Sequence, residues 1–360
     1  MIKFLKDWYQ RHFTDPQVVL LAVLLILGFA VVLFAGKILA PLLAAIVIAY
    51  LLDGAVVRLE HWKLPRWLAS TIVFIIFSIL FAAILIWLIP LLSRQLVQFF
   101  TEVPNMIGEG QKLLLQLPEK YPDFISDEEV TALISQFRGQ VADMGQKVVS
   151  TSFASVLNII TVLVYLVLVP VLIFFLLKDK PKILNWAGGF LPRDRGLAMQ
   201  VWNEMNAKIA SYARGKFVEI IIVWVVSYIT FTLFNLNYAM LLSVTIGLSV
   251  IIPYVGAAAA GIPVLFISYF QFGLSMPMLY VVAAYAVIQF LDGNVLIPVL
   301  FSEVVNLHPV AIIAAVLIFG GIWGLWGIFF AIPLATLVQA VLNAWPNDLV
   351  ETEKITAPAD

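Results

Sequence analysis

The sequence predicts an all-α, polytopic integral membrane protein with about eight transmembrane helices, some broken or re-entrant, and a small extramembrane helical insertion. The first reason is composition: 62% of the 360 residues are hydrophobic and 12% are charged. A soluble domain has about 45–50% apolar residues and about 25% charged residues. The second is a mean hydropathy of +1.02. The third is a series of long uncharged runs, since a helix needs about 20 apolar residues to cross a bilayer. A soluble enzyme and a disordered chain are both excluded.

The N-terminal region, 1–93, is predicted to be a three-span bundle. Residues 16–36 carry no charge, and this run is too long for the apolar core of a signal peptide, so we expect a signal-anchor helix. Residues 38–52 are short for a full crossing, and we expect them to form a hairpin with the first span, with Pro41 in their first turn. The third span is predicted in the uncharged run 67–93.

The segment 94–147 is predicted to be an amphipathic helical insertion on the periplasmic side. Ser126 and Glu129 have the spacing of a capping box, which is typical of a helix start, and apolar residues recur at helical spacing after it. This insertion either packs on itself or a neighbouring subunit, or it forms a gate or docking surface. The fourth span is predicted within 148–177, which holds no charge.

The distribution of Lys and Arg predicts the orientation, because cytoplasmic loops carry the excess of basic residues. The segment 178–216 has eight basic and three acidic residues, a charge of +5, whereas 94–147 has five basic and eight acidic, a charge of −3. We therefore expect a cytoplasmic N-terminus and a basic cytoplasmic interfacial segment at 178–216. Its amphipathic helix is expected to turn into the next span near Phe217.

The C-terminal region, 217–346, is predicted to be a broken-helix transport region, followed by a polar tail at 347–360. Residues 220–291 and 304–347 are uncharged runs of 72 and 44 residues. The predicted helix breaks are Pro253, Gly256, Pro263, Pro298, Pro309 and Pro333. A broken helix in lipid leaves carbonyls that only protein or water can satisfy, which favours a substrate pathway. Ordinary kinking and close helix packing are the alternative.

Polar residues in this region form the candidate transport site. They are Asp292, Asn294, Gln289, Asn306, His308 and Glu303. Asp292 is the only formal charge between Glu219 and Glu303, and an acid at membrane depth costs about 2.5–3.5 kcal/mol on insertion scales. It is either a cation or proton site, or a turn residue that caps the following helix. Glu303 and His308 are expected in an interfacial link.

The sequence offers no pattern typical of an enzyme, a cofactor site or a metal site. It has no cysteine and three histidines, so disulfides and thiolate ligands are excluded and a histidine-built metal site is disfavoured. It also lacks a phosphate-binding Gly-Lys-Ser/Thr motif, so transport by this chain would be passive or coupled to an ion gradient. A net charge of −1 gives no basic field for nucleic acid.

Several short stretches, taken in order, resemble the autoinducer-2 exporter (AI-2E) transporter family. They are Tyr212-Ala-Arg-Gly-Lys216, Leu236-Asn-Tyr-Ala-Met-Leu-Leu242, Ile252-Pro-Tyr-Val-Gly256, Gln289-Phe-Leu-Asp-Gly-Asn-Val-Leu-Ile-Pro298 and Leu307-His-Pro309. The resemblance covers nearly the whole chain. It implies an eight-span transporter of the bacterial inner membrane that forms a homo-oligomer, with a pentamer as one arrangement. Members of this family have been linked to autoinducer export and to sodium/proton exchange, and the resemblance does not separate these cargoes.

The predicted function is a multi-pass inner-membrane permease or exporter for a small polar solute such as a signalling molecule, not driven by ATP. Its expected partners are membrane lipids and a small solute or cation. Two alternatives stay open: a monovalent cation/proton antiporter, and a non-transporting scaffold or regulator that uses 94–147 and 178–216 as its surfaces.

Overall fold

The computed structural model describes residues 16–114, 135, 136, 139, 143, 156–192, 195–253, 255–301 and 307–344, and its regular elements there are all helical. Six helical segments are long and apolar enough to cross a membrane, and four shorter apolar helices accompany them. The six are Pro16–Gly36, Ile38–His61, Arg66–Val103, Gly196–Leu233, Val255–Phe272 and Met276–Phe301. The prediction of an all-α, polytopic membrane protein is confirmed.

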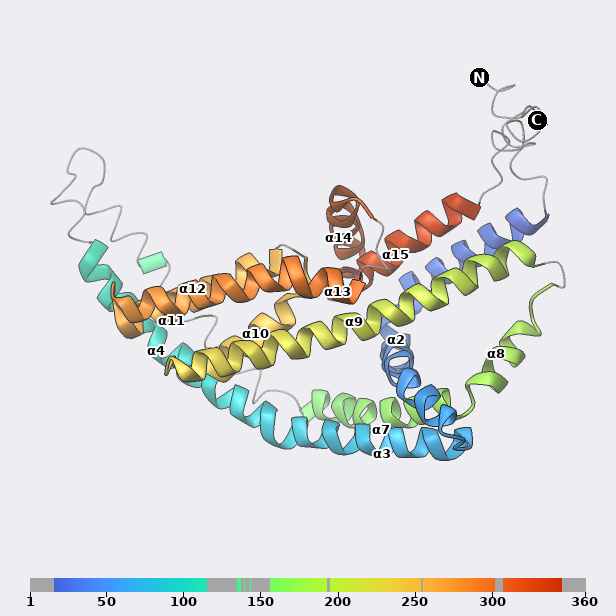
Figure 1. Ribbon diagram of the computed structural model, residues 1–360, viewed down its shortest axis with the longest axis horizontal. Helices are drawn as coiled ribbons and strands as arrows, with labels where there is room; N and C mark the ends of the chain where they lie inside the picture. Colours follow the sequence, from blue (N-terminus) through green and yellow to red (C-terminus); the bar gives the residue numbers. More distant parts are fainter. Residues whose placement is uncertain are drawn as a thin grey trace, which may run out of the picture.

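The first two predicted spans belong to one helix, α2 (Pro16–His61). Figure 1 shows its two halves running in different directions. Pro41 lies inside this helix, and a proline bends a helix because it removes one backbone hydrogen bond and crowds the preceding turn. The expected hairpin is therefore wrong, since residues 38–52 continue the first span through a bent helix without an intervening turn.

Helices α3 (Arg66–Ala83), η1 (Ile84–Leu88) and α4 (Ile89–Leu114) follow one another without a turn. Helix α3 packs with α2 and α7 (Val156–Lys178), and α7 leads into the short helix α8 (Lys180–Gly188). The buried core of this N-terminal unit consists of Ala45, Ala49, Val56, Ala69, Val73, Ile173 and Leu177.

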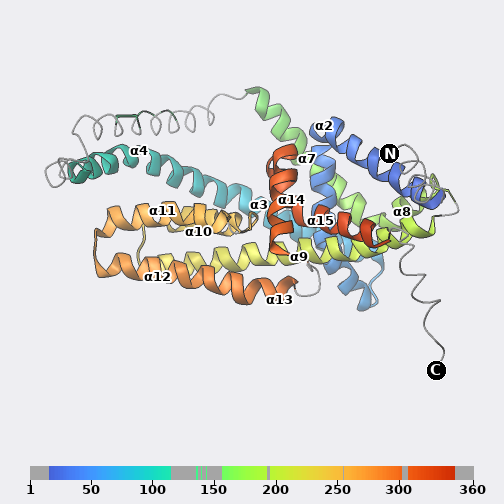
Figure 2. The same ribbon diagram turned by 90° about the horizontal axis from the view of Figure 1, so that it is seen from above.

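Helix α4 leaves the N-terminal unit and packs against α10 (Ala239–Ser249) (Figure 2). Gln95 Oε1 accepts a hydrogen bond of 2.8 Å from the backbone N–H of Leu241. The Tyr238 hydroxyl donates to Glu102 Oε2 at 2.5 Å. These bonds tie α4 to the start of α10. The capping box predicted at Ser126 lies outside the described residues.

A group of charged side chains, the Arg66 cluster, joins the ends of α2, α3, α7 and α8. Arg66 Nη2 lies 2.8 Å from Asp53 Oδ1, and Arg66 Nη1 lies 3.0 Å from Glu60 Oε2. Arg66 also donates to the backbone carbonyl of Leu177 at 3.0 Å. Leu177 lies in the last turn of α7, so its carbonyl has no hydrogen-bond partner within that helix. Lys180 Nζ lies 2.7 Å from Asp53 Oδ2. The cluster therefore fixes one end of the N-terminal unit.

We expect Arg66→Met to lower the free energy of unfolding by about 2–3 kcal/mol, because hydrogen bonds to charged groups contribute this much and Asp53 Oδ1 and the Leu177 carbonyl lose the Arg66 donor. Unfolding by sodium dodecyl sulfate in mixed micelles measures the change. Lys182→Met is the matched control, since Lys182 pairs with Asp179 at 85% exposure, and a surface substitution costs about 0.5 kcal/mol at most. Equal effects of the two variants would contradict this role of Arg66.

The C-terminal half is built on α9, Gly196–Leu233, a continuous helix of 38 residues. Its length is about 57 Å at 1.5 Å per residue, nearly twice the thickness of the hydrocarbon core. The turn expected near Phe217 is not present in this helix. The amphipathic helix expected at the interface instead packs within the protein, where Val201 and Met205 are buried against Leu21 of α2.

Helix α10 packs along α9, and α11 (Val255–Phe272) packs on α10 and on the helix that follows it (Figures 1 and 2). The α10–α11 connection is described for residues 250–253, and Pro253 lies in it. Gly256 lies in the first turn of α11. A buried core holds these helices to α9 and the following helix, and consists of Val223, Phe231, Leu236, Leu242, Ile246, Val250, Ala260, Val264, Ile267, Val281 and Ile288.

Helix α12 (Met276–Leu291) continues through the π-helical stretch η2 (Asp292–Leu296) into α13 (Ile297–Phe301). The interpretation of Asp292 as part of a turn is therefore wrong, since the backbone there stays helical and is only wound more loosely. Pro298 is the second residue of α13 and lies inside this continuous helical run, so it does not break the helix as predicted.

The chain ends its described part with α14 (Pro309–Trp323) and α15 (Leu325–Ala344), which pack on each other and join at Gly324. Pro309 is the first residue of α14. Pro263 and Pro333 lie inside α11 and α15, so neither residue breaks its helix as predicted. One lost backbone hydrogen bond is tolerated in a spanning helix when neighbouring groups satisfy the freed carbonyl.

Candidate functional site

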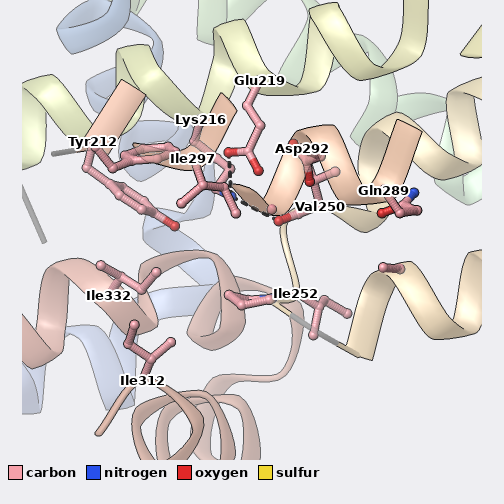
Figure 3. Close-up of a pocket in the computed structure, with 14 residues that line it drawn as sticks. Tyr212, Lys216, Glu219, Val250, Ile252, Gln289, Asp292, Ile297, Ile312 and Ile332 are labelled. Atoms are coloured by element: carbon pink, nitrogen blue, oxygen red, sulfur yellow. Dashed lines mark hydrogen bonds and ion pairs between the residues drawn. The ribbon is translucent and has the colours of Figure 1, made fainter. Parts of the chain in front are cut away.

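A cavity of about 260 Å³ lies between α9, the α10–α11 connection, α12–α13 and the α14–α15 pair. Figure 3 shows its polar side chains grouped toward one side, together with Ile297, and three other isoleucines on the facing side. The polar lining residues are Tyr212, Lys216, Glu219, Gln289 and Asp292, and the facing isoleucines are Ile252, Ile312 and Ile332.

Lys216 is 4% exposed and lies near the middle of α9. Its Nζ lies 2.6 Å from Glu219 Oε2, one helical turn away, and donates to the backbone carbonyl of Val250 at 2.9 Å. It also lies 5.3 Å from the centre of the Phe301 ring, a distance at which a cation is attracted to the face of a ring. Val250 caps the end of α10, so Lys216 satisfies a carbonyl at the helix end, where intrahelical partners run out.

Glu219 and Asp292 present carboxylate oxygens to this cavity without hydrogen bonds. Glu219 is 1% exposed, and apart from its ion pair with Lys216 neither of its oxygens has a hydrogen-bond partner. Asp292 is 8% exposed and its Oδ1 has no hydrogen-bond partner, and the same is true of Gln289 Nε2. A buried polar group without a partner is costly. Such groups side by side at one cavity indicate a binding site.

Local helix geometry places these groups together. Lys216 and Glu219 are three residues apart on α9, a spacing at which side chains share a face. Asp292 is the first residue of η2, and single π-helical turns within α-helices are frequent at functional sites. The connection at Pro253 ends α10 and leaves the Val250 carbonyl free for Lys216.

A family model described as "AI-2E family transporter" matches residues 21–347. The chain belongs to the AI-2E transporter family. It is 45% identical over 353 residues to "Putative permease PerM" of Escherichia coli (strain K12). The aligned region covers 98% of this chain and 100% of that protein. It is 25% identical over 318 residues to "Putative transport protein YueF" of Bacillus subtilis (strain 168), which covers 86% of this chain and 84% of that protein. Neither name specifies a solute or a coupling ion.

This AI-2E transporter therefore is a multi-pass membrane protein of a transport family. The structure brings two of its six predicted site residues, Asp292 and Gln289, to the cavity. Asn294 is exposed and its Nδ2 donates to the Phe290 carbonyl of its own helix at 2.8 Å. His308 does not line the cavity; its Nδ1 accepts a hydrogen bond from the backbone N–H of Val310 at the start of α14.

The remaining two predicted site residues, Glu303 and Asn306, lie outside the described residues. Three further residues line the cavity that the sequence analysis did not include in the candidate transport site, namely Lys216, Glu219 and Tyr212. The missed signal is the pair of opposite charges three residues apart at the edge of the uncharged run. Two side chains three residues apart lie on the same face of a helix, so an oppositely charged pair can be buried together as an ion pair.

A second cavity of the AI-2E transporter, about 190 Å³, lies next to the Arg66 cluster. Its charged lining residues, Asp53 and Lys180, are paired with each other. It therefore offers a ligand fewer unpaired charged groups than the first cavity does. In the part of the chain that the structure describes, no group of three or more His, Asp or Glu side chains could hold a metal ion.

Proposed function

We propose that this AI-2E transporter moves a small polar solute across the bacterial inner membrane, without ATP, through the cavity around Lys216, Glu219 and Asp292. The observation that carries the proposal is the pair of buried carboxylates with unpaired oxygens at this cavity. Intramembrane acids face a bundle interior or a wet cavity and mark solute pathways in transporters. The proposal includes the cytoplasmic N-terminus that the basic residues predict.

The α10–α11 connection is the moving part in this proposal. Lys216 holds the Val250 carbonyl at its beginning, and Ile252 and Pro253 line the cavity. Short irregular segments between helices absorb large backbone changes more readily than helices do. Release of the Lys216 bond would let the connection shift and open the cavity toward one face of the membrane, while the long helix α9 stays fixed.

A thiol-labelling experiment tests this pathway, and the absence of native cysteines makes it specific. Ala257→Cys places one thiol at the cavity wall. We expect a charged, membrane-impermeant methanethiosulfonate to modify this thiol in inside-out vesicles and also in right-side-out vesicles. An alternating-access cavity meets water on each side of the membrane in turn, so the thiol is reached from either face. Reaction is followed by the mass shift of the purified protein.

Val299→Cys is the matched control, because Val299 is 71% exposed on the nearby helix α13 and is absent from the cavity lining. This thiol is expected to stay unmodified, since we expect an exposed side chain on a membrane-spanning helix to face lipid. A non-transporting scaffold predicts no modification of Ala257→Cys from either face. That result, in a variant that elutes as a folded protein, would remove the pathway.

A further inference from the structure

We propose that this cavity binds solutes that carry a primary ammonium group. The inference rests on the proposed transport function and adds the chemical class of the solute. The lining holds one positive group, Lys216, and two negative groups, Glu219 and Asp292. The cavity is therefore one positive charge short of balance, and an ionised group at this depth favours a bound partner of opposite charge.

Lys216 itself shows what the cavity offers an ammonium group. Its Nζ has a carboxylate at 2.6 Å, a backbone carbonyl at 2.9 Å and an aromatic ring at 5.3 Å. An ammonium has three N–H donors and no acceptor, and these neighbours are acceptors or negative ring faces. The side chain of Lys216 is thus a tethered ammonium that occupies the site when no solute is bound.

Unused acceptors remain for a second ammonium. Asp292 Oδ1 and Glu219 Oε1 have no hydrogen-bond partner and lie in residues that are at least nine-tenths buried. An anionic solute would add to the negative charge, and a neutral solute would leave the imbalance in place. A solute ammonium adds one positive charge to that of Lys216, so that two positive charges balance the two carboxylates inside a medium of low dielectric.

The facing wall of the cavity indicates an organic cation rather than a bare metal ion. The side chains of Ile252, Ile312 and Ile332 contain no oxygen atom, whereas hard metal cations take six or more oxygen ligands. An apolar wall opposite a charged one fits a short alkyl chain that ends in an ammonium group. Most small-molecule sites combine an apolar lining with a few polar groups in this way.

Solute binding would act on the moving part through Lys216. A solute ammonium that pairs with Glu219 displaces the Lys216 ammonium toward Asp292, the other carboxylate of the cavity. The Val250 carbonyl then loses its donor, and the α10–α11 connection is freed. The charge of the occupied site stays balanced throughout, so the step needs no co-reactant.

The experiment measures binding of radiolabelled n-butylammonium to the full-length protein in phosphatidylcholine nanodiscs. We expect saturable binding that unlabelled butyramide, a neutral analogue, and butyrate, an anionic analogue, do not displace. Asp292→Asn is expected to weaken binding about 10- to 100-fold, the factor typical of one lost charge-assisted hydrogen bond. Glu204→Gln is the control, since Glu204 is a carboxylate on α9, the helix of Lys216 and Glu219, and pairs with Lys208 away from the cavity. Its substitution should not change binding.

The variant Lys216→Met separates an effect on binding from an effect on folding, because we expect it to bind the probe more tightly. Without the tethered ammonium, both carboxylates are open to the probe, and we expect n-butylammonium to bind about tenfold more tightly. We also expect the probe to raise the melting temperature of this variant more than that of the unchanged protein. A misfolded variant would lose binding and could not give this result.

Two outcomes overturn the inference. One is equal displacement of the probe by butyramide, and the other is the absence of saturable binding in both the unchanged protein and Lys216→Met. In either case, modification of Ala257→Cys from both faces still decides the transport pathway. Failure of the solute class and failure of the proposed function are therefore distinguishable.

Discussion

Gly256→Ala is expected to disrupt the packing of α10 against α11 and with it the cavity. A Cβ atom at this position would lie 1.7 Å from the carbonyl oxygen of Ser249 and 2.6 Å from its carbonyl carbon. Both atoms belong to the backbone at the end of α10, so a change of side-chain rotamer cannot relieve the overlap. The helix ends must move apart, which costs about 3 kcal/mol or more for an overpacked site.

The measurement is the fraction of protein that elutes as a single folded species in detergent, together with its melting temperature. Gly321→Ala is the matched control, since Gly321 lies inside α14 with no atom within 4 Å of its added Cβ, and alanine favours a helix over glycine by about 1 kcal/mol. A Gly256→Ala protein that melts like the unchanged protein would show that the two helix ends can separate without cost.

The spans could be predicted from the sequence because charge is the property that lipid excludes most strongly. The uncharged run 67–93 lies within Arg66–Val103, and most of the long run after Glu219 lies in helices. The joins between spans were predicted less well. Pro41 allows a bent helix as readily as a turn, and only the packing of α2 on its neighbours decides between them.

The extent of α9 could not be predicted from a count of charges. Lys208, Arg214 and Lys216 looked like one basic, water-facing segment, and Lys208 does pair with Glu204 at the surface. Lys216 differs because its ammonium meets a carboxylate, a carbonyl and a ring inside the protein. Identical residue types have opposite surroundings here, and the difference lies in distant parts of the chain, at Val250 and Phe301.

Two of the five polar lining residues could be predicted from local sequence. Asp292 and Gln289 are one turn apart on α12 and η2, so helical spacing alone places them on one side, and both line the cavity. Asn294 is only two residues further on, which turns it away from Asp292, and it bonds to its own helix. His308 lies at the start of α14, where its side chain accepts a hydrogen bond from that helix.

Lys216→Met is expected to lower the free energy of unfolding by about 3–5 kcal/mol, because removal of one partner from a buried ion pair leaves an uncompensated charge. Glu219 is 1% exposed and its remaining oxygen has no other partner, so solvent cannot replace the lost ammonium. The Val250 carbonyl loses its donor as well. Unfolding by sodium dodecyl sulfate in mixed micelles, without added amine, gives the value.

The double variant Lys216→Met/Glu219→Leu is expected to regain most of this stability, since apolar residues of similar volume often replace a buried pair at little cost. It should nevertheless bind n-butylammonium more weakly than Lys216→Met does, because one of the two carboxylates is gone. A double-mutant cycle gives the coupling free energy of the pair, and we expect at least about 2 kcal/mol for residues in direct contact. Additive effects would mean that the 2.6 Å contact contributes nothing to folding. A stable double variant with unchanged binding would assign the ammonium site to Asp292 alone.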